Sequence, residues 1–380
     1  MPPLPVSEFE RRLDQQLKLL QTLVEMESPT TDKSALDALG DFMAKRMRNA
    51  AAEVQRFAQE QAGDHWLGQW GSGPGGILML VHLDTVHPIG SLKTMPCVTR
   101  AGKLFGPGVL DMKGGIAMAL TAIEVLRQAS RMPAKRVSLL CTSDEETGSH
   151  TSRGIIEDLA RDHEAVFCLE PGLSDGSLKT WRKGVGIFRL KALGRAAHAG
   201  GDPENGVNAI IEIAHQIQRL SKLEDTGAGT TLNMGVIMGG TRSNVVPNTC
   251  SLLVDLRVKT PEEQERLEKA LQEIPPVLDG AQVLVEGEWN RPPMPCTPVI
   301  SQAFSRAQSI ASKLDIQLGQ GGTGGASDAN FVAPLGIPLL DGLGPLGGGA
   351  HSEREFVIIE SLPLRTALLA ALISEWHLDR

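Results

Sequence analysis

The chain has 380 residues and a formal net charge of −8, with 41% apolar and 22% charged residues. These proportions are those of a soluble globular protein, and the length predicts two domains or one domain with a large insertion. The acidic balance argues against a nucleic-acid footprint, and the lack of any Lys/Arg-rich run argues against a membrane-surface role.

The N-terminal stretch MPPLPVSEFERRLDQQLKLL has no basic region followed by an apolar one, so we predict no signal peptide. No apolar run approaches the ~20 residues that are needed to cross a bilayer. The five cysteines are odd in number and lack CxxC spacing. We therefore expect reduced core cysteines in a cytoplasmic protein.

Helices and apolar strands alternate through the first half of the chain. Helices are predicted at residues 9–27, 34–51, 114–129 and 152–163, and strands at 77–84, 136–142 and 165–169. Buried strands that alternate with helices predict an α/β domain, with a mostly parallel sheet and helices on both faces.

The pattern changes near Trp181. From Gly186 to about Glu288 the order is β-α-β-β-α-β, which predicts an inserted ferredoxin-like α+β domain. The Pro-rich stretch 291–298 marks the return, and helices at 299–314 and 360–377 with a short strand near 337–340 complete the first domain. We predict a catalytic domain from residues 1–182 and 290–380, and an inserted lid or dimerisation domain at 183–289.

Histidine and carboxylate side chains follow several strands of the first domain. They are His82 and Asp84 in HLDTVHP, Asp111 in VLDMKGG, Glu145 and Glu146 in SDEETGS, and Glu170 in LEPG. Open α/β sheets bind ligands at the carboxyl ends of their strands, so we expect these residues to gather there. An isolated acidic pair is more often a solvated turn, but this many carboxylates in one crevice require a cation.

Imidazole and carboxylate ligands without thiolate favour Zn²⁺, with Co²⁺ or Mn²⁺ as alternatives. A second histidine ligand is then expected. His351 in GGGAHSE is preferred over His87, which lies five residues after His82 in a turn-like context.

The motifs HLDTV, GPGVLDMKGG, SDEETGS, LEPG and AHSE, in this order, resemble the dinuclear zinc amidohydrolase family. That family contains glutamate carboxypeptidases, aminoacylases, acetylornithine deacetylases and succinyl-diaminopimelate desuccinylases. HAGGDPENGVNAI, TRSNVVPNT and TGGASDAN are most similar to the glutamate carboxypeptidases. The resemblance implies two divalent metal ions per subunit and a homodimer formed through the inserted domain.

The resemblance also implies a role for each residue of the first domain. The metal ligands would be His82, Asp111, Glu146, Glu170 and His351, with Asp111 bridging both ions. Asp84 would orient the His82 ring, and Glu145 would be the general base that takes a proton from the attacking water. We expect an extended segment here, on which Glu145 and Glu146 point to opposite sides.

In the inserted domain, the resemblance implies that His198 reaches the partner subunit's active site and stabilises the oxyanion. Arg257 would bind the substrate carboxylate, with Asn244, Gly325 and Ala326 as further substrate contacts. Without the resemblance, His198 would more often be structural, and Arg257 would be an ordinary surface charge as often as a binding residue.

We therefore predict an enzyme, a metal-dependent hydrolase of the amide bond of a peptidyl or N-acyl L-amino acid with a free α-carboxylate. Release of C-terminal glutamate is the first choice, and deacylation of an N-acetyl or N-succinyl amino acid is the second.

Two short motifs point to other classes of enzyme. GQGGTG (319–324) satisfies G-x-G-x-x-G and has Asp341 downstream, so an NAD-dependent oxidoreductase is an alternative. GLSDG (172–176) satisfies G-x-S-x-G of serine hydrolases. In both places the helix that the motif requires is short or missing from the pattern.

Overall fold

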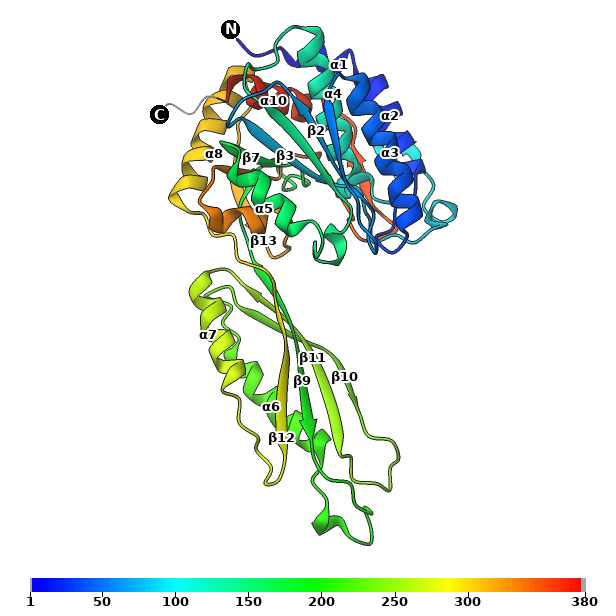
Figure 1. Cartoon of the computed structure of the whole chain (residues 1–380), viewed down its shortest axis with the longest axis vertical. Coiled ribbons are helices and arrows are strands. Elements are labelled where there is room, and N and C mark those ends of the chain that lie inside the picture. The colour runs from blue at the N-terminus through cyan, green and yellow to red at the C-terminus, as the bar shows by residue number, and fades with distance from the viewer. Residues whose placement is uncertain (1, 377–380) are drawn as a thin grey trace. The chain divides into compact units, whose positions relative to one another are not determined.

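The computed structural model describes residues 2–376 and divides into two compact units (Figure 1). The major unit comprises the chain up to Thr180, Cys296–Gly322 and the residues from Ser327 onward. The inserted unit comprises Trp181–Pro295 and the short segment Thr323–Ala326. Each unit has its own hydrophobic core.

An eight-stranded sheet forms the centre of the major unit. Its order is β1 (Glu53–Phe57), β2 (His65–Trp70), β6 (Val137–Thr142), β3 (Ile77–His82), β7 (Ala165–Cys168), β14 (Leu339–Asp341), β8 (Leu178–Arg182) and β13 (Gln320–Thr323). The four strands β6, β3, β7 and β14 run parallel, while β1, β2 and β8 pair antiparallel. The predicted α/β class is confirmed, although β1, β2, β8 and β13 were not anticipated.

Helices flank this sheet (Figure 1). They are α1 (Val6–Glu10), α2 (Leu13–Glu25), α3 (Lys33–Asn49), α4 (Gly114–Gln128), α5 (Arg153–Arg161), α8 (Pro298–Ala311), α9 (Ala329–Val332) and α10 (Ser361–Glu375). The helix predicted at 9–27 is two helices, and the expected end of the last helix at residue 377 lies outside the described residues. A small antiparallel sheet contains β4 (Val98–Arg100), β5 (Lys103–Phe105), β15 (Gly347–Gly348) and β16 (Phe356–Ile358).

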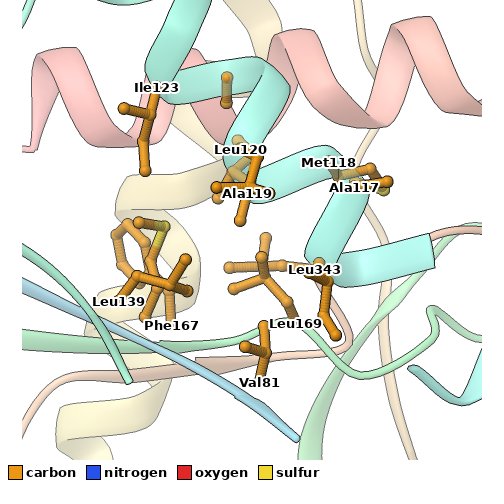
Figure 2. Packing of buried hydrophobic residues seen from close by; sticks show 14 of the residues in the cluster. Val81, Ala117, Met118, Ala119, Leu120, Ile123, Leu139, Phe167, Leu169 and Leu343 are labelled. Atoms are coloured by element: carbon orange, nitrogen blue, oxygen red, sulfur yellow. The ribbon is translucent and has the colours of Figure 1, made fainter. Parts of the chain in front are cut away.

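Helix α4 is the central helix of the major core. Its side chains Leu120 and Ile123 face Leu139, Phe167 and Val81 of the sheet, and all five are at most 2% exposed (Figure 2). Full burial of one such side chain stabilises the fold by about 1.5–3 kcal/mol. This packing fixes α4 and therefore the turn that precedes it.

The inserted unit has the predicted ferredoxin-like topology. Its elements are β9 (Gly184–Leu193), α6 (Ala209–Leu220), β10 (Thr231–Gly239), β11 (Thr249–Val258), α7 (Pro261–Gln272) and β12 (Gln282–Arg291), and the antiparallel sheet order is β10-β11-β9-β12. Buried residues alternate with exposed or half-buried ones along β9 and β11, because one face of the sheet packs against α6 and α7 (Figure 1).

The structure contradicts both alternative motif readings. Residues 320–323 of GQGGTG form strand β13, and the next helix, α9, has only 4 residues, so no helix begins at this glycine-rich segment to receive a pyrophosphate. GLSDG is followed by strand β8, where a nucleophile elbow requires a helix. Within residues 2–376, no helix combines the length and apolarity of a membrane span.

We expect His163 to make folding stability depend on pH. The ring is 5% exposed and lies 2.6 Å from the Leu159 carbonyl oxygen and 2.9 Å from Ser138 Oγ. Burial lowers the pKa of His163 to about 4. Between pH 4 and the ordinary value near 6.5 the unfolded chain binds the extra proton, so stability falls as pH falls through this window.

The measurement is urea unfolding of the metal-free protein at pH 7 and pH 5, compared with His163→Gln. Between these two pH values the wild type should lose about 2 kcal/mol more stability than the variant. An equal loss in both proteins would show that His163 does not titrate in this way.

Candidate metal centre

The ends of three neighbouring parallel strands bring the predicted ligands together. His82 is the last residue of β3, Glu170 follows β7, and Glu146 follows β6 in a 3-10 turn (η3, Glu145–Thr147). Because β6, β3 and β7 are adjacent and parallel, their carboxyl ends lie at one edge of the sheet.

Asp111 lies in the turn before α4 and faces both histidines. Its Oδ1 is 3.1 Å from His82 Nε2, and its Oδ2 is 3.3 Å from His351 Nε2. Glu170 Oε1 lies 3.5 Å from the same His82 nitrogen, and Glu146 Oε2 lies 3.2 Å from the same His351 nitrogen. Asp111 therefore stands between two groups, each with one imidazole and one further carboxylate.

The charges of this cluster strongly affect its protonation. Burial opposes protonation of His82, but hydrogen bonds with Asp111, Asp84 and Glu170 outweigh it and raise the His82 pKa well above its ordinary value. Hydrogen bonds with Asp111 and Glu146 raise the pKa of His351 to about 11. In the metal-free protein, protons on the two imidazoles thus supply positive charge to the carboxylates.

The two carboxylates that contact His351 respond in opposite directions. Burial would raise the pKa of Asp111, yet its hydrogen bonds with His351 and His82 lower it. Burial raises the pKa of Glu146. Hydrogen bonds therefore stabilise the charged form of Asp111, whereas burial disfavours the charged form of Glu146.

Asp84 connects the ends of β3 and β6. It is fully buried, and its carboxylate accepts hydrogen bonds from the amides of Glu145 (3.2 Å) and Glu146 (3.0 Å). His82 Nδ1 lies 2.9 Å from the Asp84 carbonyl oxygen and 3.4 Å from its Oδ1. Donation from Nδ1 leaves Nε2 of His82, which faces Asp111, as the nitrogen that would lose its proton when a metal ion binds.

The acidic pair departs from the expected extended conformation. Glu145 and Glu146 lie in the 3-10 turn η3, so the strand alternation that we expected does not separate their side chains. In a 3-10 turn, neighbouring side chains point about 120° apart because there are three residues per turn. The side chains of Glu145 and Glu146 can therefore still point in different directions, because of the turn geometry and not because of strand alternation.

His87 does not join the cluster. Its Nε2 lies 2.8 Å from Glu355 Oε2, and the ring is 8% exposed. His351 occupies the cluster with a backbone φ of 60°, in the left-handed region that non-glycine residues rarely adopt. Sequence reasoning missed Thr30, whose hydroxyl donates to Asp84 Oδ2 at 2.7 Å.

The donor set fits divalent cations. His82, Asp111 and Glu146 each offer one ligand atom, and these atoms all lie within 4.8 Å of one another. Glu146 Oε1 is buried and has no hydrogen-bond partner within residues 2–376. A buried, unsatisfied carboxylate oxygen on a residue grouped with an imidazole and a second carboxylate is the donor chemistry of a divalent metal site.

In the inserted unit, the structure brings His198 and Asn244 together. His198 forms a β-bridge with Val245, and the Ala199 amide donates to the Asn244 carbonyl oxygen at 3.0 Å. The amides of the two glycines that follow, Gly200 and Gly201, donate to His198 Nδ1 at 3.1 and 2.9 Å. The His198 ring is exposed, and since Nδ1 accepts, its proton belongs on Nε2.

Arg257 lies beside the segment that contains two other predicted substrate contacts, Gly325 and Ala326. Its Nε and Nη2 donate to the Asp255 carboxylate at 2.7 and 2.9 Å, and its Nη1 donates to the Gly324 carbonyl oxygen at 3.4 Å. The carbonyl oxygens of Gly325 and Ala326 accept from Arg182 Nη1 at 3.2 and 3.1 Å. The 323–326 segment therefore packs within the inserted unit next to Arg257.

Comparison with known proteins finds a matching family and similar enzymes. Residues 78–375 match the family described as peptidase family M20/M25/M40. The chain is 30% identical over 378 residues to carboxypeptidase G2 of Pseudomonas sp., covering 97% of this chain and 91% of that protein. It is 29% identical to the succinyl-diaminopimelate desuccinylase of Dechloromonas aromatica, over 73% of this chain and 76% of that protein.

Solved structures share the fold at lower identity. A metallo-carboxypeptidase of the M20 family from Sulfolobus solfataricus aligns with a TM-score of 0.72 and 16% identity, covering 94% of this chain and 98% of that one. The aminopeptidase PepT from Bacillus cereus aligns with a TM-score of 0.74 and 23% identity, covering 97% and 98%. At these identities, the structural similarity shows that the fold is shared and nothing more.

We expect the metal-free protein to bind two Zn²⁺ ions per chain, and His351→Ala to weaken one of the two binding steps by more than ~100-fold, since changes to outer partners alone cost 10–100-fold. Metal analysis and competition with a chelating dye measure both steps. His150→Ala, which changes an exposed histidine, is the matched control. Two binding steps of wild-type strength in His351→Ala would contradict the assignment.

Proposed function

The chain belongs to peptidase family M20/M25/M40, and we propose that it hydrolyses the amide bond of a peptidyl or N-acyl L-amino acid with a free α-carboxylate. Membership makes it a metal-dependent hydrolase. One observation carries the proposal: the two carboxylate oxygens of Asp111 face two separate histidine–carboxylate groups, which is the arrangement of a carboxylate that bridges two cations.

We assign the ligands of the two ions from these contacts. His82 and Glu170 would hold one ion, Glu146 and His351 the other, and Asp111 both. Zn²⁺ is the proposed metal, because two imidazoles and three carboxylates without thiolate match its preferences, with Co²⁺ or Mn²⁺ as substitutes. Bound divalent ions supply Lewis acidity that polarises the substrate carbonyl and makes water a nucleophile at neutral pH.

Glu145 is the proposed general base and acid. Its carboxylate would take a proton from the attacking water and return a proton to the leaving nitrogen. The hydrogen bond from its amide to Asp84 supports this role, because the same aspartate also orients His82. The base and a metal ligand are thereby held by one buried carboxylate.

His198 is the proposed oxyanion donor. Because Gly200 and Gly201 donate to its Nδ1, the exposed Nε2–H is available to donate to a negatively charged oxygen. Arg257 is the proposed partner of the substrate carboxylate, with Gly325 and Ala326 alongside. The Asp255 carboxylate supports that role by holding the guanidinium in a fixed orientation.

The geometry of the inserted unit supports a site shared between two subunits. Strand β11 is 10 residues long, so its ends are about 30 Å apart. Arg257 is near its last residue, whereas Thr249 at its start pairs with Leu193, after which the chain continues to His198. One small substrate cannot touch both side chains of one chain, so we propose that His198 serves the site of a partner subunit.

An exposed apolar surface supports the proposed homodimer. Strand β10 is an edge strand of the inserted sheet, and its residues Val236, Ile237 and Met238 are 49%, 52% and 62% exposed. Ile210 and Ile211 of α6 are also exposed. An apolar edge strand favours pairing with another copy, and burial of these side chains would stabilise the dimer.

Glutamate-type carboxypeptidase activity is our first candidate, supported by 30% identity to carboxypeptidase G2 over nearly the whole chain. Deacylation of an N-acyl amino acid is the second, supported by the desuccinylase relatives. Both reactions break an amide bond next to a free carboxylate. We keep the cytoplasm as the proposed compartment, and the absence of disulfides among the five cysteines supports it.

We expect Zn²⁺- or Co²⁺-loaded protein to release glutamate from folyl-glutamate or N-acyl-glutamate, faster than it deacylates N-succinyl or N-acetyl amino acids. Initial rates on this panel, with and without chelator, measure the preference. Glu145→Gln should lower kcat by about 10²–10⁴ while metal binding is retained, since a general base contributes that factor.

Faster turnover of the N-succinyl substrates would favour the deacylase. Chelator-insensitive hydrolysis, or a fully active Glu145→Gln, would contradict the proposed chemistry altogether.

A mixing experiment tests the shared site. His198→Ala and Glu145→Gln proteins should each be nearly inactive, because loss of one oxyanion donor costs about 10²–10³ in kcat. After unfolding and refolding together, mixed dimers contain one site with both residues intact, so partial activity should return. Met238→Asp should prevent dimer formation, measured by sedimentation, and should also prevent this recovery. No recovery in stable mixed dimers would show that His198 acts in its own chain.

A further inference from the structure

Glu355 is a buried carboxylate, 1% exposed, that contacts the turn carrying Asp111. Its Oε1 accepts hydrogen bonds from the amides of Leu110 (2.8 Å) and Asp111 (3.0 Å). Its Oε2 accepts from the Gly108 amide (3.1 Å) and lies 2.8 Å from His87 Nε2, which donates because an ionised carboxylate only accepts. Four donors compensate the burial of this charge.

The turn around Asp111 is built on this carboxylate. Gly108 has a φ of 68°, and the backbone then turns tightly through Val109–Lys113 into α4. Three amides that point at one anion form a concave binding site for negative charge. Without the anion, these largely buried N–H groups would lose their partner, so Glu355 sets the position of the Asp111 backbone.

Glu355 also belongs to the loop that carries His351. The chain folds tightly between them, with the Ser352 amide donating to the Gly349 carbonyl at 3.0 Å and the Glu355 amide donating to the Ser352 carbonyl at 3.2 Å. Strand β16 begins at the next residue and pairs with β5. A movement of Glu355 would therefore displace His351 relative to Asp111.

The third ligand-bearing segment reaches Glu355 through His87. His87 lies five residues beyond His82 and is buried against the Glu355 carboxylate. Segments that carry His82, Asp111 and His351 thus meet at one side chain.

We infer that Glu355 is a positioning residue that sets the spacing of Asp111 and His351 before metal binds, with His87 as its supporting donor. The inference rests on the metal centre proposed above. Glu355 acts through the backbone of the Asp111 turn and through its own loop, and it makes no direct contribution to the ligand set.

The test is Glu355→Gln, which preserves size but directs an NH₂ group at backbone donors. The Kd for Zn²⁺ should rise about 10–100-fold, the range for residues that orient metal ligands. Competition between metal-free protein and a chelating dye measures it. The visible absorption of the Co²⁺-loaded protein should also change, because the ligand geometry relaxes.

Glu212→Gln is the matched control. Glu212 is fully buried and accepts hydrogen bonds from the Val277 and Leu278 amides in the inserted unit. Its loss should lower the Tm without changing zinc affinity or the Co²⁺ spectrum. Wild-type zinc affinity and spectrum in Glu355→Gln, or an equal loss of affinity in Glu212→Gln, would overturn the inference.

If Glu355→Gln does not fold, His87→Ala provides the second variant, because it removes one donor of the four. The Kd for Zn²⁺ should then rise several-fold, and an unchanged Kd would overturn the inference. Wild-type protein that binds no divalent ion would refute the proposed metal centre itself. Normal Zn²⁺ binding by the wild type, together with an unchanged Kd in the variants, would refute only the role of Glu355.

Discussion

Neutralisation of clustered carboxylates is the constraint on which the catalytic geometry depends. Two unit charges 4 Å apart interact by about 4 kcal/mol at an effective dielectric constant of 20, so Asp111, Glu146 and Glu170 cannot share a pocket without positive charge. In the metal-free protein, His82 and His351 supply it as protonated imidazoles, which is why their pKa values rise. The same contacts mark where divalent ions would sit, with Asp111 between them.

The parallel sheet lowers the conformational entropy cost of bringing these residues together. Adjacent strands β3, β6 and β7 end at one edge, so short segments suffice to bring their terminal residues together. Asp84 then connects two of these ends, since it accepts from the amides of Glu145 and Glu146 and holds the His82 ring. The proposed ligands, held on the sheet and by buried hydrogen bonds, would thus be positioned before a metal ion binds.

The inserted unit separates the residues of two proposed tasks along one sheet. Arg257 and the 323–326 segment lie at one end, where a fixed guanidinium can bind a carboxylate, while His198 and Asn244 lie at the other. This separation is consistent with the proposed substrate-binding role of Arg257, and the exposed apolar strand β10 is consistent with the proposed second subunit. The exposed apolar edge strand β10 would promote aggregation of a monomer, whereas a dimer interface would cover it.

Several features followed from the sequence because they depend on local pattern. Apolar runs ending in His82, Asp111 or Glu170 indicated strand ends or turns where candidate ligands gather. The ferredoxin-like order of the inserted unit was predicted from the spacing of apolar residues and the length of each segment. The flanking strands β1, β2, β8 and β13 were not predicted, because their strand character depends on neighbours far along the chain. The place of His351 in the cluster was also expected from the sequence. Only tertiary structure put His87 against Glu355, placed the acidic pair in a 3-10 turn, and set the tautomer of His198. Side-chain direction and long-range hydrogen bonds depend on how distant segments pack, and no local pattern encodes that.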